Sequence, residues 1–204
     1  MDGPGGVYLG LIRDTDKSIR PSFLGQTSVK SFQVDLTDVD HKSLVLSSSD
    51  GRSLLSNTPN ADEDYIPLIR DLNRRFGDPA YHYTAKAASL SVNGHRLFPD
   101  NKQPIYVIFD TGVTGMVVSS EIFDERYHSA RRNREKNLWG KVEITMTSKN
   151  GHPMAFEASS PVTTPFGQRP WPRFRNAHLV VMGLAFLDNH CMTIDINQMK
   201  LWFQ

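Results

Sequence analysis

The feature that most constrains the fold of this 204-residue chain is an apolar run that leads directly into the turn Asp110-Thr111-Gly112. A second apolar run leaves the turn through Met116 and Val118. Strand-like runs usually end in turn residues that face water, whereas this turn presents a carboxylate. Because glycine has no Cβ, the backbone at Gly112 can pass close to the carboxylate and donate its N–H to it. The pattern predicts that two strands, one on each side of the turn, hold Asp110 in a fixed position.

A second apolar run that ends in glycine lies far along the chain. Leu-Val-Val-Met at 179–182 precedes Gly183, and Leu-Ala-Phe-Leu follows at 184–187. Strand-like segments at 193–196 and 200–203 complete the chain. Between the two motifs, residues 141–147 alternate in period two, Asn150-Gly151 supplies a turn, and residues 154–157 return, which predicts a β-hairpin.

The order of these segments resembles a single lobe of the retropepsin-like aspartic proteases, over about residues 80–204. The resemblance implies a mainly β domain at 80–204, an acid-protease-like closed β-barrel lobe with one or two short helices. It leaves residues 1–79 as an N-terminal β/α extension. In this family Asp-Thr-Gly forms the catalytic loop, an apolar-apolar-Gly run crosses behind it, and the hairpin between them is the flap.

The resemblance also implies a role for each residue of the loop. Asp110 would be the catalytic carboxylate, the hydroxyl of Thr111 would bond across a two-fold axis, and Gly112 would donate its N–H to the carboxylate. Gly183 would permit close packing beneath the loop. Aspartic proteolysis needs two carboxylates that share one proton, and this chain has one Asp-Thr-Gly. The implied enzyme is therefore a homodimer in which two copies of Asp110 meet.

The implied substrate is a polypeptide that binds as an extended strand under the flap. Its expected contacts are Thr114, Met146, Gly151 and Met154, with the flap tip at about residues 148–152. The reaction implies no metal and no organic cofactor. The expected activity is that of an aspartic endopeptidase.

An alternative reading is a protease-like fold that serves as a non-catalytic subunit of a larger, possibly organellar, assembly. Retroviral members often carry Arg and then Asp or Asn after the second glycine, and these residues tie the dimer together. Here Leu184-Ala185 stand there, which is more similar to cellular and bacterial single-lobe relatives or to the second lobe of pepsin-like enzymes. Residues 1–79 and the proline-rich segment 159–175 would then provide docking surface for other protein subunits.

Composition excludes several other classes. A hydrophobic fraction of 39% and a charged fraction of 22% favour a folded chain, and a net charge of +1 argues against nucleic acid as a partner. The longest apolar run, 179–187, is too short to span a membrane. One cysteine, Cys191, permits no internal disulfide, and the first residues lack the blocks of a signal peptide. We expect an intracellular protein, cytoplasmic or organellar after removal of a targeting segment.

Residues 1–79 carry their own secondary-structure signals. Strands are predicted at 7–12 and 31–37, a hairpin around Asp50-Gly51, and a helix at 65–76 that Gly77 ends. The extension is too small for a good core, so we expect the apolar stripe of its helix to pack on the 80–204 lobe. Further along, Asn93-Gly94 predicts a hairpin, Ser119 or Ser120 a helix cap, and the basic run 131–136 a solvated surface.

Overall fold

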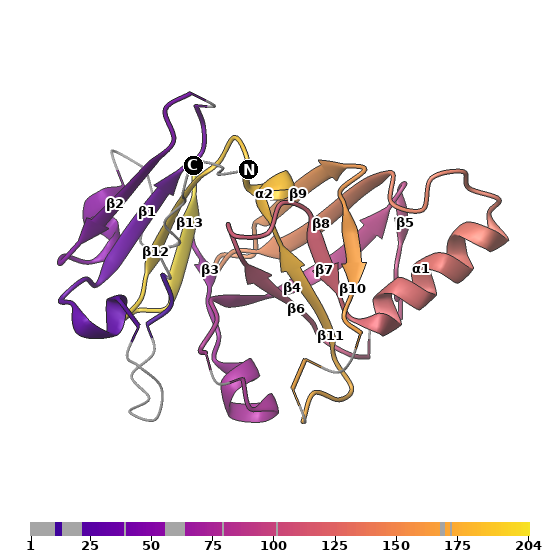
Figure 1. Cartoon of the computed structure of the whole chain (residues 1–204), viewed down its shortest axis with the longest axis horizontal. Helices are drawn as coiled ribbons and strands as arrows, with labels where there is room; N and C mark the ends of the chain where they lie inside the picture. The colour runs from indigo at the N-terminus through magenta and orange to yellow at the C-terminus, as the bar shows by residue number, and fades with distance from the viewer. Residues whose placement is uncertain are drawn as a thin grey trace, which may run out of the picture.

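The computed structural model describes residues 11–13, 22–38, 40–55, 64–78, 80–100, 102–167, 170–171 and 173–204. The protein is mainly β, and its strands form two sheets that lie side by side (Figure 1). The strand predicted at 7–12 falls largely outside the described residues, and residues 11–12 do not belong to a strand.

The first sheet is antiparallel and has the strand order β2-β1-β12-β13-β3. Its strands are β1 (Ser31–Asp35), β2 (Ser43–Ser47), β3 (Ile66–Pro67), β12 (Cys191–Asp195) and β13 (Lys200–Phe203). It therefore joins strands from before residue 79 to the last two strands of the chain. Two short 3-10 helices, η1 (Leu24–Gln26) and η2 (Gly51–Leu54), lie in the same N-terminal region.

The second sheet has eight strands in the order β10-β7-β11-β6-β4-β8-β9, with β5 paired to β4. The strands are β4 (Thr84–Val92), β5 (His95–Arg96), β6 (Ile105–Phe109), β7 (Met116–Val118), β8 (Lys141–Thr147), β9 (Pro153–Ser159), β10 (Thr163–Pro165) and β11 (His178–Met182). Strand β11 runs parallel to β6 and antiparallel to β7. It therefore lies between the two strands that flank Asp110.

The closed β-barrel implied by the family resemblance is not present in the described part of the chain. There the strands form two open sheets, and β9 and β10 end the main path of the second one without pairing to each other. The strands β12 and β13, expected to belong to the lobe, pair instead with β1 and β3 of the N-terminal segment. Long-range pairing of this kind leaves no local signal in the sequence.

The two sheets share one hydrophobic core. Phe32 and Ile194 from the first sheet and Val107 and Val180 from the second belong to the same buried cluster. A smaller cluster packs Leu72 and other residues of the helix η3 (Leu72–Phe76) against Tyr106 and Ile108 of β6. Because neighbouring strand residues point to opposite faces, β6 is covered on both sides, and all five of its residues are buried.

Several predicted elements are confirmed. Strand β1 covers most of the segment expected at 31–37, and β8 and β9 form the predicted hairpin. Gly94 and Gly151 have φ angles of 77° and 85°, the left-handed conformation that each turn requires. Gly77, also left-handed with φ 78°, ends η3.

Other predicted elements are wrong. The expected hairpin at Asp50-Gly51 is absent because β2 pairs back with β1 and residues 51–54 form η2. The helix expected at 65–76 is divided, since Ile66–Pro67 joins β13 as strand β3 and only Leu72–Phe76 is helical.

The helix α1 (Ser120–Arg132) is longer than expected and extends into the basic run. Ser119 is its N-cap residue, but its side chain makes no capping bond and instead accepts the N–H of Leu179 at 3.3 Å. The second helix, α2, is the short segment Leu184–Leu187. Among the described helices, none has the length and apolar character needed to cross a membrane.

Candidate active site

Asp110 stands immediately after the buried strand β6, at the start of a tight loop. Its backbone N–H donates to the carbonyl of Met182 on β11 at 3.0 Å, which ties the loop to the strand beneath it. The N–H of Gly112 donates to Asp110 Oδ1 at 2.8 Å, and the N–H of Val113 donates to the Asp110 carbonyl at 3.2 Å. Asp110 is a half-buried residue, and its carboxylate is held by the backbone of its own loop.

Gly183 lies directly beneath this loop. A Cβ at Gly183 would stand 2.1 Å from the carbonyl oxygen of Val113 and 2.4 Å from that of Gly115, so only glycine fits. The N–H groups of Leu184 and Ala185, the first residues of α2, donate to the carbonyls of Val113 and Thr114 at 2.7 and 2.8 Å. The second apolar-Gly segment thus supports the Asp110 loop from below.

A second glycine, Gly115, is required because the chain at Val162 passes very close to it. A Cβ at Gly115 would stand 2.0 Å from the carbonyl oxygen of Val162. That same carbonyl accepts the N–H of Met116 at 2.9 Å. Gly115 therefore allows the segment leading into β10 to pair closely with the strand that leaves the loop.

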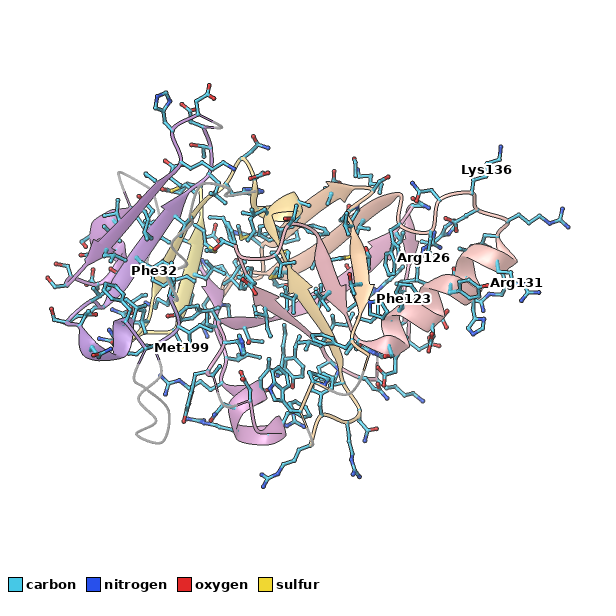
Figure 2. The ribbon with its side chains drawn as sticks, viewed as in Figure 1. Phe32, Phe123, Arg126, Arg131, Lys136 and Met199 are labelled. Carbon is cyan, nitrogen blue, oxygen red and sulfur yellow. The ribbon has the colours of Figure 1, made fainter. Side chains whose placement is uncertain are left out.

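A cavity of about 510 Å³ lies against the Asp110 loop. Asp110, Thr111 and Gly112 line one part of it, and Phe32 of β1 and Met192 of β12 line another. Residues Leu11 and Ile12 of the N-terminal segment also line this cavity. Phe32 is labelled on β1 in Figure 2. The candidate site is thus the Asp110 carboxylate beside a largely apolar cavity between the two sheets.

The sequence reading missed two polar residues of this cavity, His82 and Tyr83. His82 Nδ1 lies 2.8 Å from a carboxylate oxygen of Asp78, whose side chain is fully buried. Burial opposes the ionisation of Asp78, but the bonds from His82 and from the N–H of Ala80 outweigh it and lower its pKa. Burial raises the pKa of Tyr83, whose hydroxyl donates to the Leu11 carbonyl at 2.7 Å. No motif marks these residues, because pairing of β4 with β6 brings them to the site.

The structure does not bring the four expected substrate contacts to this cavity. Met146 is fully buried in the core, and Met154 is half-buried against the same cluster. Gly151 is exposed at the tip of the β8–β9 hairpin, and Thr114 is exposed on the Asp110 loop. None of the four lines the cavity beside Asp110.

The hairpin tip is attached to the chain before β3. Lys149 donates its N–H to the carbonyl of Tyr65 at 2.8 Å, and His152 Nδ1 lies 3.3 Å from a carboxylate oxygen of Asp64. The tip is therefore held at residues 64–65 rather than over the Asp110 loop.

The basic run lies at the far end of α1. Arg131 and Lys136 project outward there in Figure 2. By contrast, Arg126 is fully buried and forms an ion pair with Glu135, and this pair fixes the chain that follows the helix. In the described part of the chain, no group of three His, Cys, Asp or Glu side chains is arranged to hold a metal ion.

A scan against protein-family models finds no match to this chain, and a search of curated proteins finds none either. The sequence motif and the geometry of the Asp110 loop are therefore the features of this protein that bear on its function.

Proposed function

We propose that this protein is a retropepsin-like aspartic endopeptidase with Asp110 as its catalytic carboxylate. The supporting observation is the structure of the Asp110 loop, which follows the buried strand β6. The N–H of Gly112 donates a hydrogen bond to the Asp110 carboxylate, and Gly183 packs closely beneath the loop. A carboxylate held by backbone groups keeps its position while charge changes around it. The adjoining cavity of about 510 Å³ offers room for water and a peptide chain.

In the proposed reaction, two carboxylates share one proton. The ionised carboxylate takes a proton from water, and the protonated one donates a hydrogen bond to the carbonyl of the peptide bond that is cleaved. This chain supplies one such loop, so the second carboxylate would be Asp110 of another copy. The Thr111 hydroxyl makes no hydrogen bond to the described residues, so it is available to bond across the axis of the dimer.

A second candidate function is a non-catalytic subunit with a structural or docking role. The observation that favours it is the wall of the Asp110 cavity, where Leu11, Ile12 and Phe32 of the same chain stand. A second copy of the chain would have to approach the Asp110 loop in a dimer, and these residues already lie beside that loop. In this alternative Asp110 remains a single carboxylate, and other protein subunits bind the outer surfaces.

Cleavage of unfolded protein substrates, measured by mass spectrometry from acidic to neutral pH, separates the two functions. We expect the native chain to cut peptide bonds and Asp110→Asn to be inactive yet folded, because amide and carboxylate have nearly the same shape. The matched control is Asp124→Asn, which changes an exposed carboxylate on α1 and should leave activity intact. Hydroxyl-containing transition-state mimics should inhibit the native chain. An absence of Asp110-dependent cleavage at every pH would support the non-catalytic alternative.

A further inference from the structure

A small second pocket of about 180 Å³ adjoins the Asp110 cavity. Its polar lining consists of Arg13, Arg70, Asn197 and two tyrosines, Tyr81 and Tyr83. Met199, which also lines it, is labelled in Figure 2 beyond the end of β12. Tyr83 lines both the pocket and the Asp110 cavity, and the cavity residues Leu11 and Ile12 directly precede Arg13. The two hollows are therefore neighbours.

The pocket is cationic and its charge is not neutralised by the described residues. Arg13 Nη1 donates to Asn197 Oδ1 at 2.8 Å, while the Nε of Arg13 is buried without a partner among those residues. Arg70 pairs with no carboxylate in the same part of the chain. Its neighbour Asp71 is already engaged, because Lys86 lies 3.0 Å from its carboxylate and the Tyr106 hydroxyl donates to it at 3.1 Å.

Two guanidinium groups around one pocket repel each other, and an anion between them removes that repulsion. Arginine suits a carboxylate especially well, since its planar fork of N–H donors matches the two oxygens. The buried Nε of Arg13 is one such donor. At about 180 Å³ the pocket is smaller than the ~300–1,000 Å³ that a drug-sized ligand occupies. It is large enough for one side chain that ends in a carboxylate.

One residue that lines the pocket, Tyr81, has an uncommon backbone conformation. Tyr81 has a φ angle of 52°, which is uncommon for a residue with a side chain, and its side chain is exposed. Strained conformations of this kind cluster at binding sites, where surrounding structure maintains them. The exposed Tyr81 ring offers apolar surface to the aliphatic part of a ligand side chain.

We propose that this pocket binds the carboxylate of an acidic residue in a peptide whose neighbouring residues extend past Asp110. The proposal rests on the proposed peptide-hydrolase function and adds a preference for acidic substrates. Arg13 and Arg70 hold the carboxylate, and Tyr83 forms the wall between this subsite and the Asp110 cavity.

Fluorescence anisotropy of labelled peptides tests the proposal with the full chain carrying Asp110→Asn, so that turnover does not consume the peptide. The probes are blocked hexapeptides that differ by a single Glu or Gln at each position in turn. We expect Glu at one position to bind at least about fivefold more tightly than Gln. Adding Arg13→Gln or Arg70→Gln should reduce that preference to about twofold or less. The matched control is Arg131→Gln, an exposed arginine at the far end of α1, which should leave it unchanged.

Thermal melting of each variant shows whether a loss of binding reflects a loss of folding. The variant Arg13→Lys provides a second check, because it keeps the positive charge and removes the planar set of guanidinium N–H donors. No Glu preference, or a preference that survives both arginine substitutions, overturns the proposal. Succinate and inorganic phosphate, added as competitors, identify a free-anion site. If these anions raise the melting temperature of the protein with Arg13 but not of Arg13→Gln, and the peptides show no preference for Glu, the peptide proposal is also overturned. Because binding is measured without turnover, a failure of Asp110-dependent cleavage contradicts the proposed function and leaves this result intact.

Discussion

Replacing Gly183 by alanine tests the close packing beneath the Asp110 loop. The added Cβ would stand 2.1 Å from the Val113 carbonyl oxygen and 2.4 Å from that of Gly115, so the backbone must move. Overpacking of this kind costs about 1–3 kcal/mol. Displacing the loop also weakens two backbone bonds, from the N–H of Gly183 to Gly115 and from the N–H of Leu184 to Val113. At about 1 kcal/mol each, they bring the expected loss of unfolding free energy to about 3–5 kcal/mol.

Urea unfolding measures this loss as a shift of the midpoint. With a slope of about 2 kcal/mol per molar urea, the midpoint of Gly183→Ala should fall by about 1.5–2.5 M. The matched control is Gly167→Ala, where nothing lies within 4 Å of the added Cβ, and it should unfold like the native chain. A midpoint for Gly183→Ala equal to that of the control would refute the packing of β11 beneath the loop.

Two further predictions concern buried ionisable groups. The buried Arg126 guanidinium lowers the pKa of Glu135 from 4.5 to about 2. Because solvent screens the partly exposed Glu135, the pair contributes about 1–2 kcal/mol of stability. Since the folded pKa is the lower one, this contribution is complete above about pH 4.5 and is lost as the pH falls toward 2. In denaturation experiments across this pH range, Glu135→Gln should lose most of the acid dependence of stability. The control is Glu125→Gln, which removes the exposed Glu125–Arg132 ion pair and should change stability by less than about 1 kcal/mol. Equal effects of the two substitutions would contradict the account. Burial raises the pKa of the Cys191 thiol to about 11, so iodoacetamide should label it slowly in the native protein and quickly in urea, and rapid native labelling would be the contrary result.

The sequence predicted best what is determined locally. The Asn93-Gly94 and Asn150-Gly151 hairpins follow from turn chemistry alone, because the left-handed conformation suits those residues. The Asp110 loop was identified because a buried strand, a carboxylate and a glycine are consecutive in the chain.

Elements that depend on distant partners were missed. Ile66–Pro67 had helical spacing but pairs with β13, more than a hundred residues away in the chain. No local pattern indicates that Arg126 is buried, and its guanidinium is enclosed through the ion pair with Glu135. His82 lines the Asp110 cavity just before β4, the strand that pairs with β6. In each case tertiary contacts override the local pattern.

Sedimentation of the native chain and of Asp110→Asn, from mild acid to mild alkali, tests the proposed dyad most directly. Two carboxylates at a two-fold axis hold one proton between them, and loss of that proton places two negative charges together. The account predicts a native dimer in mild acid that dissociates as the pH rises, and an Asp110→Asn dimer that persists at neutral pH. A monomer at every pH for both proteins would contradict dimer catalysis and favour the non-catalytic subunit.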